Sequence, residues 1–142
     1  MTTFRIRSKD YIIRFNLYHH AAPVTSRAFI KTIPFTKIFF HARVSGEEIW
    51  IDDAPALDII QENASVFAEP GEIVLGPLQP ARTRTSKCLG IYYGEGKGYD
   101  CCNIFGKVFP EDFLKLKQLG DDIWRQGTQE ITFEENDQFP ED

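Results

Sequence analysis

The sequence contains no apolar run that approaches the ~20 residues needed to cross a bilayer. Its N-terminus, Met-Thr-Thr-Phe-Arg-Ile-Arg, lacks the apolar segment of a secretory signal. It also lacks an excess of positive charge, because 16 basic residues stand against 21 acidic ones, for a formal net charge of −5. These absences predict no membrane partner, no secretion and no non-specific binding to nucleic acid.

Cysteine is scarce, and its spacing contains no Cys-x-x-Cys pair: the three are Cys88, Cys101 and Cys102. An odd number of cysteines in a chain of 142 residues predicts a reduced, cytoplasmic protein rather than a disulfide scaffold. The glycines of residues 94–98 lack the fingerprint and the helix start of a phosphate-binding loop. We therefore expect no metal and no cofactor.

Hydrophobic residues are plentiful, at 42% of the chain with 12 phenylalanines, which predicts one domain with an aromatic core. The chain is organised around residues 37–52, Lys-Ile-Phe-Phe-His-Ala-Arg-Val-Ser-Gly-Glu-Glu-Ile-Trp-Ile-Asp. Two β-rich runs, residues 37–44 and 48–52, flank a Ser-Gly turn and predict a hairpin. His41 and Arg43 are two residues apart, so we expect both side chains on the same face of the first strand.

The rest of the chain reads as strands and two helices. A helix is predicted from Pro23 to Pro34, with Val24, Ala28, Phe29 and Ile33 as its apolar stripe, and a second from Pro110 to Gly127. A short helical turn is predicted at residues 56–62 and a long loop at residues 76–87. The remaining predicted strands are residues 3–7, 11–18, 66–67, 72–75, 88–93, 101–108 and 129–134.

About eight strands and two helices predict a mainly β domain, and a closed barrel is the economical way to pair every strand edge. We expect this single domain to occupy residues 1–135, followed by an acidic tail at residues 136–142.

Four segments in the chain share their order with a known family: Ala22-Pro23-Val24-Thr25 with Phe29, Phe40-His41, Gly71-Glu72-Ile73-Val74-Leu75, and Phe105-Gly106-Lys107-Val108. Together they resemble the cyclophilins, and the resemblance covers most of the chain. It implies a closed cyclophilin-like barrel with two helices. In that family it would also imply peptidyl-prolyl cis-trans isomerase activity.

The chain departs from the active cyclophilins where their proline pocket is built. The family's Phe-Met-x-Gln-Gly-Gly is replaced by residues 44–50, Val-Ser-Gly-Glu-Glu-Ile-Trp, and the arginine comes one residue later, at Arg43. The position of the family's pocket histidine corresponds to Cys102. A closer resemblance is to small bacterial and archaeal cyclophilin-like proteins of unassigned function, in residues 41–47, 62–64 and 70–73. It implies the fold without an established reaction.

The densest polar cluster in the central hairpin consists of His41, Arg43, Glu47 and Glu48. Arg43 would bind a carboxylate or carbonyl, and His41 would donate or accept a proton near neutral pH. The alternative is structural: Arg43 pairs with one of the glutamates and His41 bonds a backbone carbonyl.

Four further residues complete the candidate ligand-binding set. Glu62 and Asn63 are candidates for the same cleft, although an asparagine in a turn usually bonds its own backbone. Tyr92 and Tyr93 face opposite sides of their strand, so one is expected in the core and the other in a pocket. No catalytic residue is assigned.

Three functions remain open from the sequence. The first is a barrel that binds a small molecule or peptide near His41, Arg43 and Glu47, without isomerase activity. The second is a weak or atypical prolyl isomerase that uses Arg43. The third is an interaction module in which exposed aromatic residues build a homo-oligomer.

Overall fold

The computed structural model describes residues 2–79 and 85–136. Within these residues the strands are β1 (Thr3–Arg7), β2 (Ile12–Leu17), β3 (Phe35–His41), β4 (Gly46–Ile51), β5 (Ala64–Ser65), β6 (Glu72–Leu75), β7 (Leu89–Gly96), β8 (Cys102–Val108) and β9 (Gln129–Glu135). The helices are α1 (Pro23–Ile30), the short 3₁₀ helix η1 (Pro110–Asp112) and α2 (Phe113–Gln126). None of the helices in this part of the chain has the length and apolar character that a membrane crossing requires.

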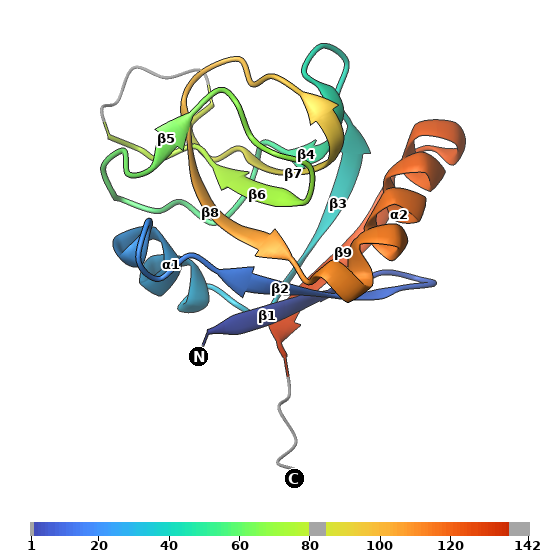
Figure 1. The fold of residues 1–142 in the computed structure, drawn as a ribbon, viewed down its shortest axis with the longest axis horizontal. Helices are drawn as coiled ribbons and strands as arrows, with labels where there is room; N and C mark the ends of the chain where they lie inside the picture. Colours follow the sequence, from blue (N-terminus) through green and yellow to red (C-terminus); the bar gives the residue numbers. More distant parts are fainter. Residues whose placement is uncertain (1, 80–84, 137–142) are drawn as a thin grey trace, which may run out of the picture.

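Eight of the strands close into an antiparallel barrel (Figure 1). Neighbours follow the order β2-β1-β9-β3-β4-β7-β6-β8, and the ring closes where β2 pairs with β8 from Phe15↔Val108 to Leu17↔Gly106. The short strand β5 pairs with β8 outside the ring. Closure pairs both edges of each of the eight strands, and the predicted mainly β closed barrel with two helices is confirmed.

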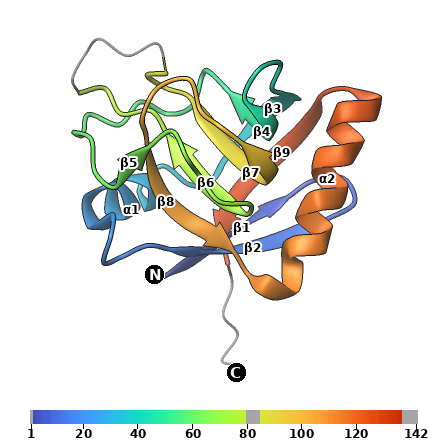
Figure 2. The same ribbon diagram turned by 45° about the horizontal axis from the view of Figure 1, so that its top comes forward.

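The barrel interior is aromatic, as the composition predicts. Six phenylalanines are at most 1% exposed: Phe4, Phe15, Phe29, Phe39, Phe105 and Phe133. Phe29 comes from α1, and its ring centroid lies 4.9 Å from that of Phe105 and 5.3 Å from that of Phe4. Helix α2 buries Leu116, Leu119 and Ile123. Figures 1 and 2 show the two helices on opposite sides of the barrel, so each covers different strands.

The first helix is shorter than predicted, because it ends at Ile30 rather than at Pro34. The backbone N–H and the side-chain hydroxyl of Thr32 both donate to the carbonyl of Phe29, which closes the last turn. Ile33 therefore lies beyond the helix, and Val24 is 43% exposed. Phe29 alone of the predicted apolar stripe reaches the centre of the core.

The central hairpin is confirmed as β3 and β4, but its turn begins earlier than predicted. His41 is the last residue of β3, and the N–H of Ala42 already donates to the carbonyl of Glu48 across the turn. Arg43 therefore lies in the turn, where strand alternation no longer applies. The prediction that His41 and Arg43 share a strand face is wrong. Gly46 has a φ of 110°, a left-handed conformation that favours glycine at the start of β4.

Three other predicted segments differ. Residues 56–62 form no helical turn, and Ile60 forms an isolated parallel β-bridge with Gln79. The predicted strand at residues 66–67 lies two residues earlier, as β5. Strand β7 continues to Gly96 because Gly46 pairs with Gly96, where a Cβ would lie only 2.4 Å from the carbonyl oxygen of Ser45. Within the predicted loop, residues 80–84 lie outside the described residues, as do tail residues 137–142.

Candidate functional site

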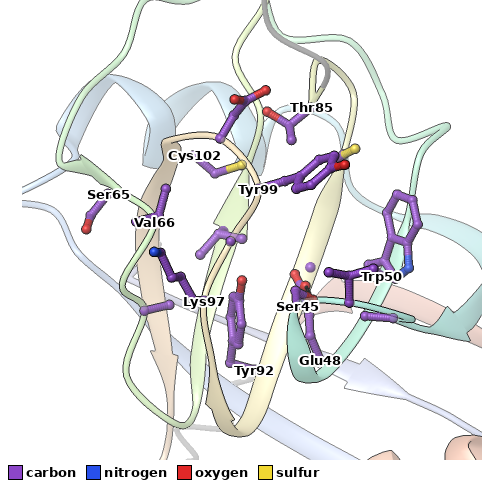
Figure 3. Close-up of a pocket in the computed structure, with 18 of the residues that line it drawn as sticks. Ser45, Glu48, Trp50, Ser65, Val66, Thr85, Tyr92, Lys97, Tyr99 and Cys102 are labelled. Carbon is purple, nitrogen blue, oxygen red and sulfur yellow. Dashed lines mark hydrogen bonds between the residues drawn. The ribbon is translucent and has the colours of Figure 1, made fainter.

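A pocket of about 280 Å³ opens on the outer surface of the barrel (Figure 3). Its floor consists of outward-facing side chains from four neighbouring strands: Glu48 and Trp50 of β4, Val74 of β6, Tyr92 of β7 and Cys102 of β8. The turn at residues 42–45 and the segments 65–68 and 97–100 supply its walls. Because Ile49 and Ile91 on the same strands point into the barrel core, the pocket is separate from the barrel interior.

A buried carboxyl group lies in this pocket. Glu48 is 9% exposed, and its Oε1 accepts a hydrogen bond from the hydroxyl of Ser45. Tyr92 is also hydrogen-bonded to the Glu48 carboxyl group. Within the described residues no lysine or arginine forms an ion pair with Glu48, and burial raises its pKa to about 7 although both hydroxyls act to lower it.

Glycines make room for the two polar side chains at the floor. A Cβ at position 90 would lie 1.9 Å from Oε2 of Glu48, so the carboxyl group occupies the space a side chain would fill. A Cβ at Gly96 would lie 2.7 Å from the ring of Tyr92, and one at Gly98 would lie 3.3 Å from its hydroxyl. Gly96 at the end of β7 and Gly98 just beyond it therefore make room for the side chain of Tyr92.

The rim of the pocket carries aromatic rings and charges of both signs, because Asp100 lines it together with Arg43 and Lys97. Tyr99, which is 64% exposed, and Val44, which is 81% exposed, line the cavity above the floor residue Trp50. Arg43 lines the same rim and is exposed. Lys97 extends toward Val66 (Figure 3), and its ammonium nitrogen lies 5.5 Å from the ring centroid of Phe67. Cations that face solvent can hold an anionic group of a ligand, but they leave the carboxyl group at the floor unpaired.

Of the residues proposed from the sequence, Arg43 and Tyr92 come together in this pocket. His41 and Tyr93 form a separate pair beneath α2. Nε2 of His41 lies 2.7 Å from the hydroxyl of Tyr93, and its ring centroid lies 4.7 Å from that of Trp124. Nδ1 of His41 lies 2.8 Å from the carbonyl oxygen of Ala42, so this nitrogen donates and Nε2 accepts from Tyr93 in the neutral ring. His41 thus anchors the residue that begins the pocket-lining turn.

Glu47 is exposed and lies on the opposite face of β4 from Glu48, where its Oε1 accepts a hydrogen bond from the N–H of Glu95. Neither it nor His41 or Tyr93 lines the pocket. The alternation that separates Tyr92 from Tyr93 also separates the two glutamates, and only one member of each pair lines the pocket.

Glu62 and Asn63 lie away from the pocket and have structural partners. Glu62 accepts hydrogen bonds from the N–H of Val24, the N–H of Thr25 and the Thr25 hydroxyl, and so caps α1. Burial acts to raise the pKa of Glu62, but these hydrogen bonds outweigh it and hold the pKa below its ordinary value. Asn63 has a φ of 49° and donates from Nδ2 to the carbonyl of Ile104. Their role in ligand binding stays a prediction.

Glu62→Ala should lower the free energy of unfolding by about 1–2 kcal/mol, because the N-terminus of α1 loses its side-chain acceptor. Urea denaturation measures the loss. The matched control is Glu69→Ala, since Glu69 is an exposed glutamate whose carboxylate forms a surface ion pair with Lys107; its effect should stay below about 0.5 kcal/mol. Equal effects of the two substitutions would contradict the capping role.

The cysteines are free thiols, and two of them, Cys88 and Cys102, line the pocket. Burial raises the pKa of Cys88 to about 12 and that of Cys102 to about 11, so both stay protonated near neutral pH. Among the described residues, no group of histidines, cysteines and carboxylates is arranged to hold a metal ion. The thiols therefore contribute apolar surface to the pocket floor.

Sequence reasoning missed Trp50, Tyr99 and Cys102 as pocket residues and treated Glu48 only as part of the hairpin cluster. One signal was present, because residues 73–75 and 89–93 are apolar on both strand faces apart from Gly90. A strand that is apolar on both faces is covered on both faces. The outer face of β6 and β7 was therefore predictable as a covered or binding surface.

Residues 4–135 match the model of a family described as "Protein of unknown function (DUF3830)". The chain belongs to this family. No curated protein matches the sequence of this DUF3830 protein.

Three solved structures resemble this DUF3830 protein. McbB in complex with tryptophan has a TM-score of 0.72 at 19% identity over 95% of this chain, which spans only 45% of the McbB chain. The hypothetical protein AF2241 from Archaeoglobus fulgidus has a TM-score of 0.68 at 19% identity, with 95% of each chain covered. A cyclophilin-type peptidyl-prolyl cis-trans isomerase from Cryptosporidium parvum, in the presence of the dipeptide Ala-Pro, has a TM-score of 0.62 at 15% identity, covering 96% of this chain and 99% of its own. These likenesses establish a cyclophilin-like fold, and at such identities they carry no function.

Proposed function

We propose that the protein binds a small organic molecule in the outer-surface pocket and does not catalyse prolyl isomerisation. The observation that carries this proposal is Glu48, a buried carboxyl group in a pocket lined mainly by apolar and aromatic side chains. A concave apolar site with few polar groups and with perturbed pKa values is typical of ligand sites. Its volume of about 280 Å³ is near the lower end of the range for such sites, which favours a small molecule over a long peptide.

The same carboxyl group argues against a proline substrate. A prolyl residue has no backbone N–H and therefore no donor to offer Glu48. Seating its ring against the floor would remove water from the carboxyl group and give it no new partner, which is unfavourable. Arg43 lies at the rim of the pocket, so an isomerase would have an arginine available there. The carboxyl group at the floor, however, is an unsuitable surface for the proline ring of a substrate.

The two tryptophans provide a built-in test of small-molecule binding. Trp50 lines the pocket, whereas Trp124 lies on α2 beside His41. In a titration of the ¹⁵N-labelled protein with a collection of small aromatic and amine compounds, a ligand in the pocket should shift the indole N–H signal of Trp50 and leave that of Trp124 in place. Failure of every compound to move the Trp50 signal would refute the proposal.

A protease-coupled isomerisation assay on an Ala-Pro-Phe peptide tests the alternative. We expect no rate above background for the wild type and none for Arg43→Ala. Clear catalysis that disappears in Arg43→Ala would establish the isomerase reading instead. In that case the carboxyl group at the floor would have to turn away from the substrate.

Tryptophan belongs among the first test compounds, because McbB has been solved in complex with it. A likeness at 19% identity carries the fold alone, so tryptophan serves as a probe and not as an assignment.

A homo-oligomeric interaction module is the second candidate function. Its supporting observation is the exposed apolar rim, where Val44, Phe67 and Tyr99 are 81%, 67% and 64% exposed. Light scattering at increasing concentration distinguishes the two functions, because a binding scaffold keeps the 16.3 kDa mass of one chain and an assembly module exceeds it.

A further inference from the structure

The floor of the pocket holds a charge without a counter-charge. Glu48 has two hydroxyl partners, Ser45 and Tyr92, and in the described part of the chain it has no cationic partner. Both partners are neutral hydrogen-bond donors, so they satisfy part of the carboxylate and leave its charge uncompensated. A buried carboxylate in this state gains most from a positively charged donor that enters with a ligand.

We infer that the pocket selects a ligand with a protonated amine, which pairs with Glu48, on a flat apolar body that packs against Trp50 and Tyr99. The inference rests on the proposed small-molecule function and names its ligand class. An ammonium group donates up to three hydrogen bonds and accepts none, which matches a site made of acceptors and hydroxyls. Trp50 and Tyr99 bring large flat surfaces to the cavity, and such surfaces pack well against an aromatic ring.

The cations of the rim do not occupy this position. Arg43 is exposed in the turn, so water screens its charge. The ammonium group of Lys97 lies over the ring of Phe67, away from Glu48 (Figure 3). A ligand amine therefore reaches a carboxyl group that the protein's own amines leave open, whereas a ligand carboxylate at the same place would face Glu48 directly and be repelled.

Binding should depend on pH through Glu48. Several other titratable or charged groups line the pocket, from the turn, from the residue before β7, from β7 and β8, and from the loop between these strands. They are Arg43, Cys88, Tyr92, Lys97, Tyr99, Asp100 and Cys102. Burial raises the pKa of Tyr92, Cys88 and Cys102, so these three remain protonated at neutral pH. Glu48 has a pKa of about 7, so its carboxyl group becomes negatively charged as the pH rises through neutrality. An amine should therefore bind more tightly as the pH rises through neutrality.

The experiment compares three indoles of similar size by the Trp50 indole N–H signal. Tryptamine carries an ammonium group, tryptophol a neutral hydroxyl and indole-3-propionate a carboxylate. Tryptamine should bind at least about tenfold more tightly than tryptophol at about pH 8, and its affinity should fall about tenfold between about pH 8 and about pH 6 as Glu48 takes up a proton. Indole-3-propionate should bind most weakly.

Glu48→Gln should remove both the preference for tryptamine and its pH dependence. Glu47→Gln is the matched control, because Glu47 is the adjacent glutamate on the opposite face of the same strand and is exposed; it should behave as the wild type does. Tryptophol binding as tightly as tryptamine would overturn the ligand class and leave the small-molecule function standing. If none of the three indoles binds, the proposed ligand class is also refuted. The titration with the broader compound collection then decides separately whether the pocket binds a small molecule.

Discussion

Glu48→Gln should make the protein more stable at alkaline pH, although it removes a charged group. The carboxyl group is 9% exposed, and burial raises its pKa from 4.5 to about 7. Between these two values the folded protein keeps a proton that the unfolded chain has released. The free energy of unfolding of the wild type therefore falls as the pH rises through this window, and the loss is complete above it.

The expected size of this effect follows from the pKa shift. A difference from 4.5 to about 7 corresponds to about 3 kcal/mol at about 1.4 kcal/mol for each pKa unit. Glutamine keeps the shape and the hydrogen bonds of the protonated carboxyl group and cannot ionise. Glu48→Gln should therefore match the wild type at about pH 4 and exceed its stability by about 3 kcal/mol at about pH 9.

Urea denaturation of both proteins across the pH range measures the difference. The comparison is needed because other groups give the opposite slope. Asp112 is buried and Glu134 is partly buried, but hydrogen bonds and ion pairs with arginines hold the pKa of each below its ordinary value. Those contributions are common to both proteins and cancel. Glu47→Gln, on the solvent-exposed side of β4, should show no pH-dependent difference. A constant difference for Glu48→Gln at every pH would mean that the carboxyl group is solvated.

Local sequence patterns predicted several barrel strands well, because turn-forming residues mark where these strands begin and end. Strands β1 and β6 lie at the predicted residues, since turn-forming residues bound both runs. The end of β7 was missed because glycines, which usually mark a turn, continue this strand to Gly96. Gly94 and Gly96 look like a flexible connection by themselves, and only the pairing of Gly96 with Gly46 of β4 reveals that the strand continues through them. Closure of the ring depends on pairing between β2 and β8, which are far apart in the sequence.

The candidate site was predictable in part. Arg43 and Tyr92 share a pocket, but the sequence joined them to His41 and Tyr93, which the structure places beneath α2. The difference comes from the end of β3 at His41, because a strand two residues longer would have kept Arg43 on the same face as His41. The adjacent Glu47 and Glu48 were certain to point in opposite directions. Which of the two faces the covered outer surface depends on segments 65–68 and 97–100, whose position no local pattern encodes.

Asn103→Ala should lower the free energy of unfolding by about 3 kcal/mol. Asn103 is fully buried on β8, and all its side-chain partners come from elsewhere in the chain. Its Nδ2 donates to Oγ1 of Thr25 at 3.0 Å and to the carbonyl of Ile60 at 3.1 Å. Its Oδ1 accepts from the N–H of Glu62 at 3.0 Å. Alanine would remove three hydrogen bonds that join the buried end of β8 to two other segments, α1 and residues 60–62.

Asn16→Ala is the matched control, because Asn16 is an exposed asparagine on β2, the strand that pairs with β8. Its effect should stay below about 0.5 kcal/mol in urea denaturation. Asn103 and Glu62 both bond to Thr25, so the double substitution of Asn103 and Glu62 by alanine should cost less than the sum of the two single ones. Additive losses would show that the two residues stabilise the protein independently. A non-additive result would establish that Glu62 belongs to a structural network joining α1 to β8, which would separate its role from the pocket of Glu48.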